Sequence, residues 1–88
     1  MKNYLVEFFA TVLFVYVILA TGNAFAIGAT LAVIALLVGP ISGGHVNPAV
    51  SVTMAAAGKL PVADLVPYVL AQIFGGLVAL EVYKRFKF

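Results

Sequence analysis

The sequence has 88 residues, of which 65% are hydrophobic and only 9% are charged, and its formal net charge is +2. Soluble domains carry about a quarter charged residues, so this composition excludes a water-soluble globular domain and indicates an integral, multi-pass membrane protein. The small and scattered positive charge gives no reason to expect nucleic-acid binding.

Three segments are apolar enough to be membrane-spanning helices, at about residues 4–20, 24–38 and 63–83. A helix rises about 1.5 Å per residue, so about 20 residues cross the hydrocarbon core. Further apolar segments follow the first one, which argues against a cleaved secretory signal. Residues 1–88 are therefore predicted to form a single all-α unit with three spans.

Small residues repeat every four positions in two places. One ridge runs from Ala20 through Ala24 and Gly28 to Ala32, and the other comprises Ala71, Gly75 and Ala79. Small residues let helix backbones approach closely in lipid. Both ridges therefore predict close helix packing.

Glycine and proline interrupt the apolar pattern between the second and third spans, where residues 39–50 read GPISGGHVNPAV. Asn47 suits a helix N-cap, Pro48 suits the first helical turn, and Gly58 suits a helix end. About ten helical residues make roughly 15 Å, half of the hydrocarbon core. Irregular backbone survives at membrane depth only inside protein or beside water. Residues 40–58 are therefore predicted to be a re-entrant loop and half-helix, with a surface loop and interfacial helix as the alternative.

The stretch SGGHVNPAV over residues 42–50 resembles the first Asn-Pro-Ala loop of the aquaporin, or major intrinsic protein, family. Three other features occur in the family's order: EFFAT beginning at Glu7, glycines at positions 28 and 39, and QIFG beginning at Gln72. Family members contain two inverted repeats, each with three spans and a half-helix, and this chain resembles the first repeat. The family's second loop has an arginine after Asn-Pro-Ala, where this chain has Val50.

The resemblance implies a passive channel for water and small neutral solutes such as glycerol, without a cofactor or a metal. Two half-helices would meet at mid-membrane, where Asn47, Pro48 and Ala49 of each would form a constriction with positive potential. The carbonyl groups just before them would accept hydrogen bonds from the permeating molecule; these belong to Gly43, Gly44, His45 and Val46. A lone histidine without nearby cysteines or acids does not suggest a metal site.

Three residues are expected to support the loop: Glu7, His45 and Gln72. An unpaired carboxylate in hydrocarbon is costly, and the resemblance implies that Glu7 is buried and accepts hydrogen bonds from the loop. The alternative is that Glu7 reaches the membrane interface. Gln72 would be an interior hydrogen-bonding residue, and His45 would brace the loop as a neutral donor, with pH sensing as its alternative.

The resemblance also implies a selectivity region, formed if a second copy supplies the family's second-repeat positions. Its members would be Ile27, Ala35, Gly44 and Val50. Such a ring is wide and apolar, and it has no arginine. It would therefore discriminate only weakly among small neutral solutes, so that glycerol would pass as well as water.

One repeat needs a partner to complete a pore. With the N-terminus inside, Lys2 and Lys59 would face the cytoplasm, and the three basic residues of the C-terminal stretch 84–87 would face outside. This near balance hardly sets an orientation. Two copies in opposite orientations would reproduce the inverted repeat, so an antiparallel homodimer is expected, with a tetramer of such dimers as a further step.

Three alternatives remain for the assembly and activity. The chain could pair with a separately encoded second half that carries the arginine, be a non-conducting fragment, or be a small dual-topology transporter. The transporter would depend on Glu7, which is the one ionisable residue within the predicted spans apart from their ends. An enzyme is not expected, because the acids are Glu7, Asp64 and Glu81 and no nucleophile–base set is visible.

Overall fold

The computed structural model describes residues 2–86, and this part of the chain is helical without strands. Its elements are α1 (Lys2–Thr21), α2 (Ala24–Ser42), α3 (Pro48–Ala56) and α4 (Val62–Arg85). Within the described residues, α1, α2 and α4 are the helices that are long and apolar enough to cross a membrane. The long axis extends over 39 Å, which exceeds the hydrocarbon core of about 30 Å.

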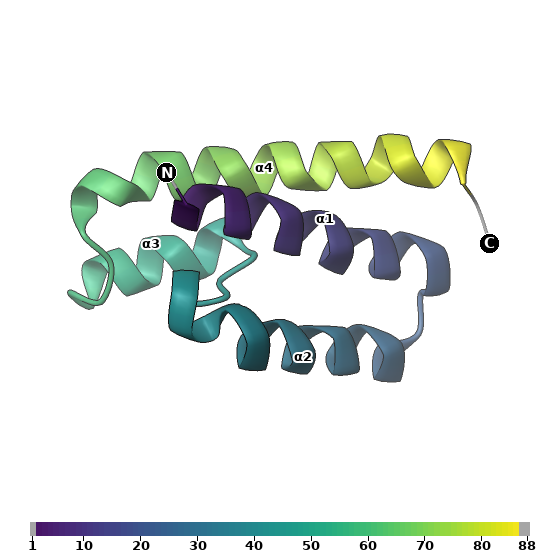
Figure 1. The fold of residues 1–88 in the computed structure, drawn as a ribbon, viewed down its shortest axis with the longest axis horizontal. Coiled ribbons are helices and arrows are strands. Elements are labelled where there is room, and N and C mark those ends of the chain that lie inside the picture. The colour runs from purple at the N-terminus through teal and green to yellow at the C-terminus, as the bar shows by residue number, and fades with distance from the viewer. Residues whose placement is uncertain (1, 87–88) are drawn as a thin grey trace.

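The three long helices lie side by side, with α1 between α2 and α4 (Figure 1). Helix α3 packs on α4, whereas the backbone of α2 approaches neither α3 nor α4 in the described part of the chain; a hydrogen bond from Tyr68 to the Ser42 carbonyl joins the end of α2 to α4. The loop after α2 runs toward the middle of the molecule, and α3 returns to the end where α2 finishes (Figure 1). The loop and α3 therefore form a hairpin that enters and leaves on the same side.

Helix α2 is longer than predicted. The second span was expected to end at about residue 38 and the loop to begin at about 40, but the helix continues to Ser42. Pro40 lies in the last turn, where it removes one helical hydrogen bond and the ribbon bends (Figure 1). Gly43 ends the helix with a left-handed φ of +93° and donates its N–H to the Gly39 carbonyl. The loop is therefore confined to residues 43–47.

Helix α3 begins at the predicted cap. Asn47 has extended backbone angles, and its side-chain oxygen accepts the N–H of Ala49 at 2.9 Å. Pro48 occupies the first turn, where its missing N–H costs nothing. The helix ends at Ala56, and Gly58 turns the chain with a φ of +77°. Nine residues make about 14 Å of helix, which is about half the thickness of the hydrocarbon core.

Helices α1 and α4 approach each other closely at Gly75. A Cβ atom at this position would lie 2.8 Å from the Phe8 carbonyl oxygen and 3.0 Å from the Thr11 Cβ. Ala79, one turn further along α4, is also fully buried. The ridge predicted on α4 therefore packs against α1. The ridge predicted on α2 is not packed against residues 2–86: Ala24, Gly28 and Ala32 are exposed, and a Cβ at Gly28 would meet nothing within 4 Å.

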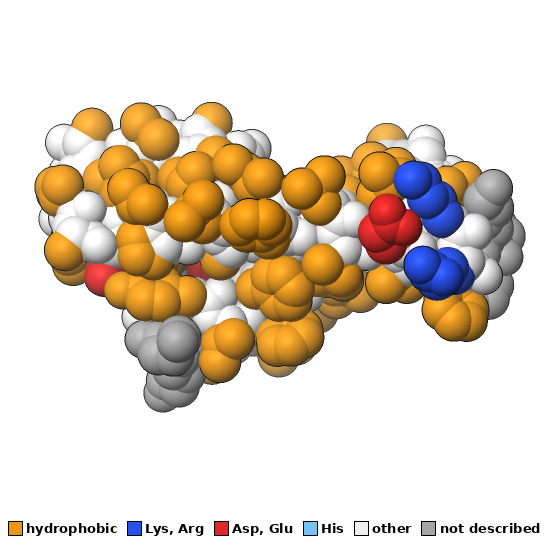
Figure 2. Space-filling view, turned by 90° about the horizontal axis from the view of Figure 1, so that it is seen from above, with side chains coloured by type: hydrophobic (Ala, Val, Ile, Leu, Met, Phe, Trp, Pro, Cys, Tyr) orange, Lys and Arg blue, Asp and Glu red, His pale blue; other side chains and the backbone are white. Residues whose placement is uncertain are grey.

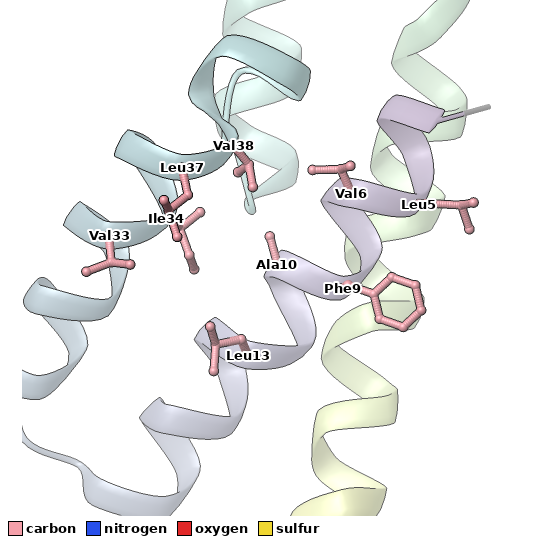
Figure 3. Close-up of a pocket in the computed structure, with 9 residues that line it drawn as sticks. All are labelled: Leu5, Val6, Phe9, Ala10, Leu13, Val33, Ile34, Leu37 and Val38. Carbon is pink, nitrogen blue, oxygen red and sulfur yellow. The ribbon is translucent and has the colours of Figure 1, made fainter.

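Helices α1 and α2 enclose an open apolar groove of about 420 Å³ (Figure 3). Ala10 and Ile34 point toward each other across it and form a buried cluster with Val46 of the loop. The remaining residues that line the groove are Leu5, Val6, Phe9, Leu13, Val33, Leu37 and Val38. The loop therefore packs, through Val46, against two of the residues that line this groove.

Apart from Glu7, the charged side chains of the described residues lie near the ends of the long helices or in the turn before α4. Figure 2 shows a face dominated by hydrophobic side chains, with basic and acidic groups gathered at the C-terminal end of α4. There Lys84 lies 3.8 Å from Glu81, and both side chains are exposed. Lys59 lies in the turn between α3 and α4, at the opposite end (Figure 1). Lys87 and the side chain of Lys2, also part of the predicted charge balance, lie outside the described residues.

Candidate pore site

Glu7 is completely buried. One carboxylate oxygen accepts the Ser42 hydroxyl at 2.6 Å and the His45 backbone N–H at 3.1 Å. The other accepts the Val46 backbone N–H and the Gln72 side-chain amide, both at 2.9 Å. Four bonds use the accepting capacity of a carboxylate. Glu7 thus joins α1 to α2, to the loop and to α4, without reaching the interface.

A second group of hydrogen bonds joins the loop to α3 and α4. Gln72 Nε2 also donates to Ser51 Oγ at 2.8 Å, and Ser51 Oγ lies 2.8 Å from His45 Nδ1. Because Ser51 Oγ already accepts a hydrogen bond from Gln72, we assign the Ser51 hydroxyl as the donor to His45 Nδ1. In this assignment the imidazole carries its hydrogen on Nε2. Tyr68 donates to the Ser42 carbonyl at 2.8 Å. These five residues are all nearly or fully buried.

In the loop, the backbone N–H groups are hydrogen-bonded within the protein, whereas the carbonyl groups are not. The N–H groups of four successive residues, Gly43 to Val46, all donate into the protein, and the last two donate to Glu7. Within residues 2–86, no group donates to the carbonyl oxygens of these four residues. The loop therefore contains a run of four carbonyl groups that are free to accept hydrogen bonds.

Asn47 follows these carbonyls directly and is exposed. Its side-chain oxygen caps α3, whereas its side-chain nitrogen has no acceptor in the described part of the chain. The N-terminus of a helix also carries about half a positive charge. Pro48 is half-buried and Ala49 is exposed. The arrangement offers acceptors followed by a donor, which suits a molecule with both kinds of group, such as water or an alcohol.

Comparison with known proteins identifies the family. The sequence model described as Major intrinsic protein matches residues 1–87. This chain belongs to the major intrinsic protein family. A segment of 58 residues is 52% identical to Aquaporin Z of Brucella melitensis biotype 1. The segment covers 66% of this chain and 25% of Aquaporin Z, so the chain spans about a quarter of that relative. No solved structure gave a significant match.

Family membership and the three long apolar helices together show an all-α, aquaporin-like half-repeat in an integral, multi-pass membrane protein. Glu7 and Gln72 hold the hairpin of residues 43–56 through hydrogen bonds to Val46 and Ser51, whereas the loop carbonyls and the side-chain nitrogen of Asn47 have no partner in residues 2–86.

The four residues of the expected selectivity region do not form a ring in one chain. Gly44 lies against α2, where a Cβ would be 3.5 Å from the Ala35 Cα. Ile27 lies eight residues before Ala35, roughly 12 Å along the helix axis. Val50 lies on α3, whose backbone does not approach that of α2 in the described residues. These four residues therefore do not line one ring within residues 2–86.

Sequence reasoning missed three members of the buried network, namely Ser42, Ser51 and Tyr68. Helical spacing offered a signal for two of them. Tyr68 precedes Gln72 by four residues, and Ser51 follows Asn47 by four, so that each lies on the same helix face as a predicted site residue. Ser42 gave no such signal, because it was expected to lie in the loop rather than in the last turn of α2.

Proposed function

We propose that this protein forms a passive pore for water and small neutral solutes, completed by a second copy in the opposite orientation. The observation that carries the proposal is the polarised loop, in which four free carbonyls lead to the free side-chain amide of Asn47. Membership of the family and the similarity to Aquaporin Z support a channel.

The need for a partner follows from the cost of free polar groups in lipid. Each unsatisfied backbone group in hydrocarbon costs several kcal/mol, and one chain leaves its loop carbonyls and Asn47 without partners. A water-filled lumen satisfies them only if protein also closes the other side. Each α3 is about 14 Å long, so two that meet N-terminus to N-terminus match a core of roughly 30 Å.

An inverted copy fits the distribution of charge. Lys59 lies at one end of the molecule and Lys84 and Arg85 lie at the other, so that basic residues mark both ends and favour neither orientation strongly. Two inverted copies are related by a two-fold axis in the membrane plane, as in other transporters with inverted repeats. Four such dimers would form a tetramer.

The two helix N-termini would control which solutes pass. Their positive ends at mid-membrane repel cations and protons, while the Asn47 amides donate to a passing oxygen. The surrounding ring of Ile27, Ala35, Gly44 and Val50, contributed by both copies, is wide and has no arginine. Neutral molecules of glycerol size should therefore pass together with water.

A second candidate is a half-channel that pairs with a different, arginine-bearing half. The length of Aquaporin Z favours it, because the matched segment is only a quarter of that protein. In this case the purified chain alone would insert and fold without conducting water.

Osmotic shrinkage of liposomes containing only this purified chain tests both candidates. Stopped-flow light scattering should show faster shrinkage than in empty liposomes, with a low activation energy and with passage of glycerol. Shrinkage at the rate of empty lipid, with folded and inserted protein, rejects the self-sufficient pore and supports the separate second half.

Orientation can be measured in the same liposomes. Because the sequence has no cysteine, Lys59→Cys introduces a single thiol at one end of the molecule. A membrane-impermeant maleimide should label about half of the chains if insertion occurs both ways up. Labelling of nearly all or nearly none of the chains would reject the antiparallel dimer.

A further inference from the structure

A polar pocket of about 370 Å³ lies at the end of the molecule where α1 and α4 begin and α2 ends (Figure 1). The polar and charged side chains that line it are those of Asn3, Ser42, His45, Lys59, Asp64 and Tyr68. Charged residues at the ends of membrane-spanning helices lie among the lipid headgroups. The pocket is therefore at the depth of the headgroups of one leaflet.

One nitrogen of a buried side chain in this pocket has no partner. His45 is 6% exposed, and its Nδ1 lies 2.8 Å from Ser51 Oγ, whereas its Nε2 has no hydrogen bond within residues 2–86. Nε2 lies beside Gly43, because a Cβ there would be 2.7 Å from it, and Gly43 also lines the pocket. Buried polar groups usually have a partner. With its hydrogen on Nε2, His45 therefore offers a donor to a ligand in the pocket.

Two opposite charges also line the pocket. Lys59 is exposed and forms no ion pair with residues 2–86. Asp64 is half-buried, and one of its carboxylate oxygens accepts the Tyr4 hydroxyl at 2.6 Å. The second oxygen has no donor in the same part of the chain. The pocket thus offers an ammonium and an imidazole donor for an anion and a carboxylate oxygen for a cation, and the two charges cancel.

The apolar groove between α1 and α2 continues from this pocket. On α2, Val38 lines the groove and Gly39 lines the pocket; on α1, Val6 lines the groove and Asn3, on the same helix face, lines the pocket. Figure 3 shows Val6 and Val38 at the end of the groove near the beginning of α1. The groove extends along α1 over residues 5–13, roughly 12 Å. This is close to the depth of one leaflet, half of a core of about 30 Å.

We propose that the pocket and the groove together bind one phospholipid with an ethanolamine headgroup. Its phosphate accepts hydrogen bonds from His45 Nε2 and Lys59, its ammonium donates to Asp64, and one acyl chain lies in the groove. A choline headgroup has no N–H to donate, and a glycerol headgroup adds a net negative charge beside Asp64. An ethanolamine headgroup matches both charges of the pocket.

The lipid site is compatible with a second copy of the chain and does not depend on the proposed pore. Leu37, which lines the groove, lies nine residues after Gly28, so that the two residues are on opposite faces of α2. A partner that packs against Gly28 therefore leaves the groove open to lipid.

Quenching of tryptophan fluorescence by lipids with brominated chains measures occupancy of the groove. The chain has no tryptophan, so Phe9→Trp places a single one at the rim of the groove, where Phe9 is 64% exposed. Phe74→Trp is the matched control. Phe74 is 55% exposed on α4, outside the groove, and it adjoins Gly75, which lies against Phe8 at a similar depth.

In mixed liposomes, brominated phosphatidylethanolamine should compete with phosphatidylcholine roughly three- to tenfold more strongly at the tryptophan of F9W, because one hydrogen bond contributes about that factor. At the tryptophan of F74W the two lipids should compete equally. A ratio near one in both variants, or the same preference in both, would overturn the proposal.

Charge substitutions in the F9W background test the headgroup contacts. Lys59→Gln should bring the ratio of ethanolamine to choline lipid close to one. Asp64→Asn keeps an oxygen for the Tyr4 hydroxyl but leaves a net positive charge, so the preference should move to anionic phosphatidylglycerol. Lys84→Gln, at the other end of α4, is the control and should leave the ratio unchanged. An ethanolamine preference that survives both K59Q and D64N would overturn the proposal.

Glycerophosphoethanolamine distinguishes a lipid from a water-soluble ligand, because it carries the same charges without acyl chains. Its addition should leave the quenching of F9W by brominated phosphatidylethanolamine unchanged. Displacement of the brominated lipid would show that the pocket binds a free phosphoester without the groove, and would overturn the proposal. All of these ratios can be measured whether or not the chain conducts water, so that failure of the pore and failure of the lipid site are distinct results.

Discussion

The two sides of α1 differ in how completely they are packed. Toward α4, small residues bring the backbones together at Gly75, and Gln72 enters a hydrogen-bond network with Glu7. Toward α2, an open apolar groove separates the helices, and Gly28 faces empty space. Hydrophobicity does not drive helices together in lipid, whereas close packing and polar contacts do. The α4 side of α1 is therefore closely packed, whereas the α2 side is held by the hydrogen bond from Ser42 to Glu7 and by the cluster of Ala10 and Ile34 with the loop, beside an open groove.

The largest expected effect comes from breaking the packed side at Glu7. Glu7→Ala leaves four buried donors without an acceptor. Each buried unsatisfied group costs about 1–3 kcal/mol, so the unfolding free energy should fall by about 3 kcal/mol or more. Thermal unfolding in detergent, followed by circular dichroism, measures the loss.

Glu81→Ala provides the control for this variant. Glu81 is also a glutamate in a long helix, but it is exposed and pairs with Lys84 at 3.8 Å. An exposed ion pair contributes about 0–1 kcal/mol, so E81A should unfold close to the wild-type temperature. Equal losses for E7A and E81A would contradict the central role of the buried network.

The next largest effect on stability is expected from substitution of two glycines, Gly75 on α4 and Gly28 on α2. Gly75→Ala places a Cβ 2.8 Å from the Phe8 carbonyl oxygen, and overpacking of this kind costs about 1–3 kcal/mol. Gly28→Ala meets nothing within 4 Å and should stabilise an isolated chain by up to about 1 kcal/mol, because alanine is the better helix former.

Unfolding of both variants in dilute detergent should therefore show opposite shifts in Tm. If α2 packs against a second copy through Gly28, G28A should also weaken association in lipid, as measured by energy transfer between labelled chains. If both substitutions destabilised the monomer, the α4 side and the α2 side of α1 would not differ in packing as described above.

Much of this comparison could be predicted from sequence, because it depends on local patterns. Apolar length predicts the long helices, and the Asn47–Pro48 pair predicts the start of α3 through capping and the missing proline N–H. The ridge containing Gly75 depends on spacing alone. These features need no knowledge of distant contacts.

The structure differs from the sequence-based expectation where it depends on a contact between distant residues, or on the balance between a helix-breaking residue and a helix cap. The end of α2 was placed too early because Pro40 was treated as a helix breaker, whereas one lost hydrogen bond near the end is tolerated and Gly43 supplies the cap. The positive φ of Val46 could not be predicted, because it depends on Glu7, which lies 39 residues away in sequence.

A smaller effect on stability, with a clear effect on permeation, is expected at Asn47. Asn47→Ala removes the α3 cap, at a cost of about 1 kcal/mol, and removes the free amide beside the carbonyls. Water permeability per protein should fall roughly three- to tenfold, as one lost hydrogen bond in the rate-limiting region implies. Stopped-flow shrinkage of liposomes measures it.

Asn23→Ala is the matched control, because Asn23 caps α2 in the same way, accepting the N–H groups of Phe25 and Ala26 at 3.0 Å. N23A should lose similar stability and keep its permeability. Equal loss of permeability in both variants would mean that capping, rather than the position beside the loop, accounts for the effect.

The smallest expected effect concerns selectivity on the open side. Ile27→Phe places a larger ring in the expected selectivity region, so glycerol permeability should fall severalfold while water permeability changes less. Leu36→Phe is the control, since it lies nine residues further on and hence on the opposite face of α2, and it is 77% exposed. Parallel measurement of glycerol uptake and osmotic water flow gives the ratio. If the wild type already excludes glycerol, or if I27F and L36F give the same ratio, the wide apolar filter is wrong, and the α2 face carries contacts rather than the solute path.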